Sequence, residues 1–66
     1  MGYKPKIGDL VEYTDTWNGD HKALAVVMKI NKTSEHNGTV NIKLLLEEKD
    51  RNYIYPWDLK LLSKAS

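Results

Sequence analysis

The sequence predicts one all-β domain built from five short strands. Short apolar and β-branched runs recur along the chain, with period-two alternation clearest over residues 39–47. The pairs Asn18-Gly19 and Asn37-Gly38 mark tight turns between these runs, because both residue types tolerate positive φ. The chain has 66 residues and no cysteine, so a small core must be held by well-paired strands without disulfides.

The first two strands are predicted at residues 10–14 and 23–30. Gly8-Asp9 opens the first strand, and Val11 and Tyr13 fall on one of its faces. Residues 15–22 form a loop or an irregular hairpin. The apolar run ALAVVM predicts that the second strand is buried on both faces, as a central strand is. Residues 32–38 then form a polar loop.

The third strand is predicted over residues 39–47, where Val40, Ile42, Leu44 and Leu46 share one face. A helix over LLLEEKDR is the alternative, since Leu, Glu and Lys are good helix formers. The β-branched residues that precede the leucines favour the strand. The segment EEKD follows as a charged turn.

Residues 51–55 form an aromatic-rich fourth strand and residues 59–62 the last one. Between them, Pro56-Trp57-Asp58 predicts a short 3₁₀ turn, because proline fixes φ and lacks an N–H donor. A C-terminal helix that starts at Pro56 is the alternative. Alternation puts Tyr53 and Tyr55 on one face and Ile54 on the other, without deciding which face is core. The single domain then occupies residues 1–66, with its folded part at about 7–63 and polar tails on either side.

Two segments resemble SH3-like barrels. The opening KIGDLVEY resembles the start of KOW, Tudor and related domains, and YIYPWDLKLLS resembles their closing 3₁₀ turn and last strand. With VVMKI, these segments also resemble small proteins of tailed bacteriophages, including T4-like phages of marine cyanobacteria. The resemblance covers roughly residues 7–63. It implies a five-stranded SH3-like barrel with long, medium and short loops and then a 3₁₀ turn, and a phage accessory or host-modulating role.

The chain departs from these families at identifiable places. Its first loop has only Asp15 and Asp20 as acids, and it has no adjacent tryptophan pair, so the PxxP binding of Src-type domains is not expected. Ala25 stands where KOW motifs usually carry glycine, which argues against ribosomal-type RNA binding.

The aromatic residues are four tyrosines and two tryptophans, with no phenylalanine. Such side chains pair an apolar body with a polar group, which suits a binding surface. In an SH3-like barrel the first loop and the 3₁₀ turn lie close together. The resemblance therefore implies a groove or cage for a cation, a proline ring or an aromatic anchor, built from Tyr13, Asp15, Trp17, Tyr55, Pro56 and Trp57. The alternative for Tyr13, Tyr53 and Tyr55 is that they fill the core.

Ten Lys+Arg against nine Asp+Glu give a net charge of +1, so the chain has no bulk attraction to nucleic acid. The interspersed lysines predict a soluble surface. The alternative is a nucleic-acid track that uses Lys29 and Lys43, on neighbouring strands, with the single arginine, Arg51. An exposed strand edge is a second route to a partner by strand addition, so we expect a monomer or a weak homodimer.

The sequence predicts no catalytic residue, cofactor or metal site. It lacks a cysteine nucleophile and a phosphate-cradling glycine loop, and no third ligand accompanies His21 or His36. No apolar run reaches signal-peptide or membrane-span length, which predicts a cytoplasmic protein without membrane partners. We therefore expect a non-enzymatic module that binds a protein. The alternatives are a KOW- or Tudor-like nucleic-acid binder and a small virion structural or assembly protein.

Overall fold

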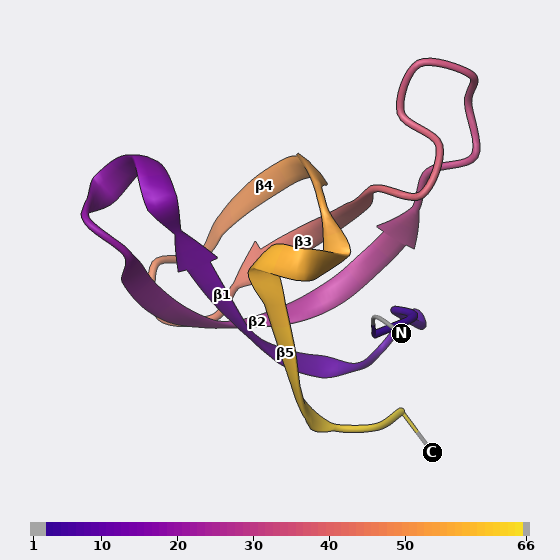
Figure 1. The fold of residues 1–66 in the computed structure, drawn as a ribbon. Coiled ribbons are helices and arrows are strands. Elements are labelled where there is room, and N and C mark those ends of the chain that lie inside the picture. The colour runs from indigo at the N-terminus through magenta and orange to yellow at the C-terminus, as the bar shows by residue number, and fades with distance from the viewer. Residues whose placement is uncertain (1–2, 66) are drawn as a thin grey trace.

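The computed structural model describes residues 3–65 as one five-stranded antiparallel sheet with two 3₁₀ turns (Figure 1). In chain order the elements are β1 (Leu10–Asp15), η1 (Thr16–Asn18), β2 (His21–Ile30), β3 (Val40–Leu44), β4 (Lys49–Ile54), η2 (Pro56–Asp58) and β5 (Leu59–Ser63). The strand order is β4-β3-β2-β1-β5, which leaves β4 and β5 as the edges of an unclosed sheet. The predicted all-β class, the five strands and the 3₁₀ turn before the last strand are confirmed.

The core lies on one face of this sheet. Val11 and Tyr13 of β1 pair with Ala25 and Ala23 of β2, and Val27 of β2 pairs with Ile42 of β3, so their side chains point to the same side. Tyr3, Ala23, Ile30 and Ile54 pack against this core from its margins. The buried hydrophobic set is Val11, Tyr13, Ala25, Val27, Val40, Ile42, Leu44 and Leu59.

The prediction that the second strand is buried on both faces was wrong. β2 is central, with β1 and β3 on either side, but only Ala25 and Val27 are buried, whereas Leu24 and Met28 are exposed. Within residues 3–65 no second layer covers the outer face of the sheet, and a strand buried on both faces needs one.

The predicted third strand was too long. β3 ends at Leu44, and Leu46 lies in the following turn with 87% of its surface exposed. The chain must reverse here, because Leu44 pairs with Lys49 across the β3–β4 hairpin. Glu48 takes a φ of +53° in that turn, a conformation that glutamate rarely adopts. The predicted charged turn therefore lies partly inside β4.

The connections do not follow the long, medium and short order that the resemblance implied. β1 continues to Asp15 and β2 starts at His21, so the first connection is only a tight hairpin turn containing η1. The longest connection runs from residue 31 to 39 and projects from the sheet (Figure 1).

The chain ends lie side by side rather than as loose tails. The backbone N–H of Gly8 donates to the carbonyl of Val27 at 2.8 Å, which places the start of the chain against β2. The N–H of Ala65 donates to Asp9 Oδ1, also at 2.8 Å. The polar tails predicted on either side of the folded part are thus fastened by hydrogen bonds over their described residues, although most of their side chains are exposed.

Candidate functional site

Four aromatic side chains form two exposed stacks, which we call the aromatic strip: His36, Tyr53, Tyr55 and Trp57. The rings of His36 and Tyr53 lie 3.8 Å apart, centroid to centroid, at an interplanar angle of 18°. Those of Tyr55 and Trp57 lie 4.4 Å apart at 6°. Tyr53 is 49% exposed, Tyr55 48% and Trp57 77%. These rings therefore hold one another in place while presenting apolar surface to solvent.

A β-bulge at the end of β4 positions Tyr53. Ile42 pairs with Arg51 but Val40 pairs with Ile54, so Asn52 and Tyr53 both lie opposite Asn41. Tyr53 has a φ of +60°, the left-handed region that favours glycine. The extra residue resets the alternation, because Ile54 packs against the core while Tyr53 stays outside.

A small polar network holds both members of the first stack. The side-chain amide of the buried Asn31 donates to Thr39 Oγ1 at 3.1 Å and to Asn41 Oδ1 at 3.0 Å. Asn41 Oδ1 also accepts the backbone N–H of Tyr53 at 3.1 Å. Thr39 Oγ1 in turn donates to the carbonyl of His36 at 2.7 Å. One buried asparagine thus links the loop that carries His36 to the strained backbone that carries Tyr53.

The 3₁₀ turn η2 positions the second stack. Tyr55 is extended, with φ −77° and ψ 142°, as expected for a residue before proline. The backbone N–H of Asp58 donates to the carbonyl of Tyr55 at 3.0 Å, and Leu59 begins β5 with its side chain in the core. The tight turn between these anchors brings the side chain of Trp57 back onto Tyr55.

Negative charge lies beside η2, around the end of the Tyr13 side chain. Burial raises the pKa of the Tyr13 hydroxyl, and the nearby carboxylates of Asp15 and Asp58 raise that pKa further, while Arg51 lowers it. A hollow of about 40 Å³ at this place is lined by Tyr13, Asp15, Glu47 and Arg51 among others. It has room for a water molecule and not for a substrate.

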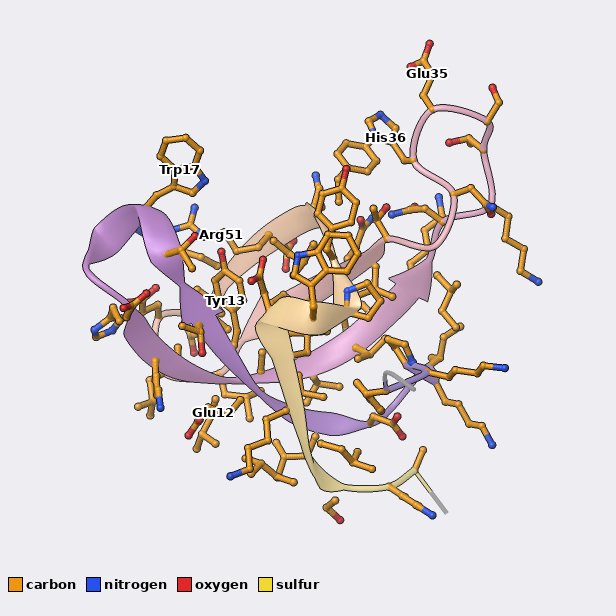
Figure 2. The ribbon with its side chains drawn as sticks, in the orientation of Figure 1. Glu12, Tyr13, Trp17, Glu35, His36 and Arg51 are labelled. Carbon is orange, nitrogen blue, oxygen red and sulfur yellow. The ribbon has the colours of Figure 1, made fainter. Side chains whose placement is uncertain are left out.

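The structure brings only part of the predicted cage together. Tyr13 is a core residue, which agrees with the alternative for that tyrosine. Trp17 is 98% exposed and stands at the tip of the β1–β2 hairpin (Figure 2), where its backbone N–H donates to Asp15 Oδ1 at 3.1 Å. It therefore packs against neither Tyr55 nor Trp57. The expected convergence of Trp17 on Trp57 is wrong: Trp57 stacks on Tyr55, and a second stack joins Tyr53 to His36.

Sequence reasoning missed two of these stacked rings. His36 was predicted only to lie in the polar loop of residues 32–38, and nothing in the sequence places it on Tyr53. Tyr53 was weighed only as a core or surface residue of β4. The alternation of Tyr53 and Tyr55 about Ile54 was the one available signal, and it agrees with the structure, since Ile54 packs against the core and both tyrosines are about half exposed. The bulge interrupts the alternation only between Arg51 and Tyr53.

The predicted basic residues do not form one track. Lys43 pairs with Asp50 and Ile42 pairs with Arg51, so Arg51 lies on the core face of the sheet and Lys43 on the outer face. Lys29 pairs with Asn41, two positions along β3 from Lys43. Asp50 directly across from Lys43 offsets its charge. Only the two lysines share a face.

Two absences hold for the described residues 3–65. No group of three or more His, Asp or Glu side chains is arranged to hold a metal ion. His36 is paired instead with its neighbour Glu35, at 3.9 Å. Neither 3₁₀ turn, nor any other segment in this part of the chain, is a helix with the length and apolarity to cross a membrane.

Comparisons of the chain with family models, with curated proteins and with solved structures found no match. The residues and their geometry therefore carry the functional argument.

Proposed function

We propose that this chain is a non-enzymatic module that binds a protein partner through the aromatic strip. The observation that supports the proposal is the pair of ring stacks, which keep Tyr53, Tyr55 and Trp57 ordered and exposed. Exposed aromatic rings held rigid lose little conformational entropy on binding, and Tyr and Trp dominate the energetics of protein interfaces. A domain with so small a core could have buried these rings, so their exposure points to an intermolecular role.

The chemistry around the strip suits a basic peptide segment. Asp15 and Asp58 both raise the pKa of the Tyr13 hydroxyl and Arg51 lowers it, so two carboxylates and one guanidinium lie around that hydroxyl, a net negative charge near η2. The outer face of Trp57 is open, and an indole face attracts Lys or Arg cations. The preferred ligand is therefore an extended segment with a Lys or Arg next to a proline or another apolar residue. The cation contacts the carboxylates while the apolar residue lies on the rings.

The finer fold assignment is part of the same proposal. The strand order β4-β3-β2-β1-β5 and the turn η2 before β5 are compatible with an SH3-like barrel. In Src-type SH3 domains the corresponding proline and nearby aromatic residues form part of the ligand face. The resemblance to small phage proteins extends the proposal to an accessory or host-modulating role in the host cytoplasm.

The edge strand β4 is unsuited to strand addition in this proposal. Lys49, Asp50 and Arg51 stand in a row on the edge strand β4, and charged side chains on an edge oppose strand addition. We therefore propose that the partner docks on side chains rather than on an open strand edge.

Nucleic acid is the second candidate ligand, because exposed stacked rings also accept bases. The carboxylates beside η2 and the division of Lys43 and Arg51 between two faces disfavour it. The two candidates differ in salt dependence. Oligonucleotide affinity falls by orders of magnitude as salt rises from roughly 50 to 200 mM when many phosphates are contacted, whereas binding to the rings changes little.

Selection from a random peptide library on the immobilised protein tests the proposal. We expect the enriched peptides to carry Lys or Arg beside an apolar residue. Trp57→Ala should weaken their binding at least tenfold, as expected of an interface hot spot. Trp17→Ala is the matched control, because it removes the other exposed tryptophan, and it should leave affinity within about twofold. Peptides that bind both variants equally, or a library that yields no peptide, would reject the aromatic strip as the ligand face.

A further inference from the structure

A second hollow lies where the segments before β1 and after β5 meet, and none of its lining residues belongs to the aromatic strip. Its volume is about 230 Å³, and it opens to solvent between the segment before β1 and the segment after β5. Tyr3, Leu61 and Ala65 provide its apolar wall. The hydrogen bond from the backbone N–H of Ala65 to Asp9 joins these two segments.

Asp9 is the residue that builds this hollow. It is only 2% exposed, and its Oδ1 accepts the N–H of Ala65. Its Oδ2 accepts the backbone N–H of Lys6 at 3.0 Å and the hydroxyl of Tyr3. These hydrogen bonds, from Ala65 above all, hold the pKa of the carboxyl below its usual range. The carboxylate is thus occupied by three donors from the two end segments of the chain and is withdrawn from solvent.

Three lysines line the same hollow as this internal carboxylate. Lys4, Lys6 and Lys64 all line the hollow, and all are exposed. The ion pairs among residues 3–65 join Lys22 to Glu12 and His36 to Glu35, so none of them involves these three lysines. Three ammonium groups against one carboxylate give a local charge of +2, in a chain whose net charge is only +1.

We propose that this hollow is a binding site for a phosphate dianion carried by a small molecule. Lysine binds phosphate as a point charge, and a local charge of +2 matches a phosphate monoester near neutral pH. The ring of Tyr3 and the side chain of Leu61 offer apolar surface to the rest of such a molecule. The proposal does not rest on the protein-binding function, because the two sites share no residue.

Amide chemical shifts measured during a phosphate titration test this site. Inorganic phosphate and phenyl phosphate are added separately at constant ionic strength, and the N–H signals of Lys6 and Ala65 report on the hollow. We expect saturable shifts at both signals, with tighter binding of phenyl phosphate if a phosphate ester is the ligand. Equal affinity would identify free phosphate instead, and either result supports the site.

Lys64→Gln should weaken binding about fivefold, the effect of removing one charge at contact distance in water. Lys49→Gln on β4 is the matched control and should leave affinity unchanged. Shifts spread evenly over the lysines of the protein, or the same weakening in both variants, would show non-specific attraction and overturn the proposal. An absence of shifts up to about 50 mM ligand, far above typical metabolite-binding constants, would overturn it as well. Binding of a short oligonucleotide without binding of phenyl phosphate would also reject it, in favour of a nucleic-acid surface.

Discussion

The imidazole of His36 stacks on the phenol ring of Tyr53, although His36 lies in the β2–β3 loop and Tyr53 in the edge strand β4. Tyr53 makes this contact from a backbone with a φ of +60°. A non-glycine residue in that region costs about 1 kcal/mol or more, and such strain gathers at functional sites. The stack on His36 and the hydrogen bond to Asn41 hold Tyr53 in a backbone conformation that glycine would adopt at lower cost.

Replacing Tyr53 with glycine should separate the cost of backbone strain from the gain of ring stacking. In a His36→Ala background we expect Tyr53→Gly to raise the free energy of unfolding by about 1 kcal/mol, because the strain is relieved and no stack remains to be lost. In the wild-type background the gain in unfolding free energy should be smaller, because the substitution also removes the stack on His36, and an aromatic pair contributes about 0.5–1.5 kcal/mol. Urea unfolding of the four variants in this double-mutant cycle measures the difference.

Tyr55→Gly is the control for that cycle. Tyr55 is as exposed as Tyr53, but its φ of −77° suits any residue. The substitution should destabilise the protein in either background, since it adds backbone entropy to the unfolded chain without relieving strain. If both glycine substitutions have the same sign with His36 absent, then strain at Tyr53 is not a significant cost.

The buried side-chain amide of Asn31 should contribute substantially to the free energy of unfolding. Asn31→Ala removes both donors to Thr39 and Asn41, and we expect a loss of about 2 kcal/mol. Asn31→Asp should cost more, because a buried carboxylate has no N–H to donate and would face two acceptor oxygens. Asn37→Ala, on an exposed residue of the same loop, should change stability by less than about 0.5 kcal/mol. Chemical denaturation gives all three values, and equal losses for Asn31→Ala and Asn37→Ala would contradict the role of the network.

Alternation of residue types predicted the sheet well wherever side chains meet the core. Val11, Ala25 and Ile42 obey it, and the proline of η2 is a local signal that depends on no distant contact. The errors have physical causes. Leu46 extends the apolar pattern of β3, but hairpin geometry ends that strand at Leu44, and residues 45–48 contain no Gly, Asn or Pro to mark the turn.

The candidate site was harder to predict because it depends on contacts between distant segments. The bulge at Tyr53 requires Asn41, which in turn is held by Asn31, and no local pattern links these three residues. The hollow at the chain ends likewise depends on Asp9 meeting Ala65. The turn residues Pro56 and Trp57 were identified because their signal is contained in adjacent residues. Trp17 was misplaced because it was positioned by family resemblance, whereas its own hairpin is short.

A pair of substitutions should distinguish core from surface on β3. Ile42 is fully buried, so Ile42→Val should lower the free energy of unfolding by about 1 kcal/mol. Leu46→Ala removes more atoms, yet it should cost less than about 0.5 kcal/mol because that side chain is already in solvent. Thermal or urea unfolding measures both changes. A larger loss for Leu46→Ala would mean that the strand continues beyond Leu44 after all.

The two tryptophans should differ in their accessibility to acrylamide. In Trp57→Phe the remaining Trp17 should be quenched almost as strongly as free tryptophan, because nearly all of its surface is exposed. In Trp17→Phe the remaining Trp57 should be quenched less, since Tyr55 covers one face of the indole. Adding Tyr55→Ala to Trp17→Phe should raise the quenching of Trp57 toward that of Trp17. Equal quenching in the two single variants would contradict the stack.

Asp9 should make stability depend on acid pH. Its pKa in the folded protein is lowered, first by the N–H of Ala65 and then by the hydroxyl of Tyr3. The contribution of Asp9 to the free energy of unfolding is therefore complete above the pKa of the unfolded chain, roughly pH 4. It is lost as the pH falls through the lowered pKa of the folded protein. Asp9→Asn keeps one acceptor oxygen but loses the one shared by Tyr3 and Lys6, so at pH 7 we expect about 2 kcal/mol less stability.

The pH series supplies the decisive comparison for that variant. As the pH falls below roughly 4, the wild-type protein should lose the Asp9 contribution while Asp9→Asn cannot, so the gap between their unfolding free energies should narrow. Every other carboxylate titrates in both proteins and cancels from the difference. Asp20→Asn, on an exposed acid whose side chain makes no hydrogen bond among the described residues, should run parallel to wild type. A gap that stays constant between pH 7 and pH 2.5 would mean that Asp9 carries no charge-dependent stabilisation, and the link between the two chain ends would then rest on packing alone.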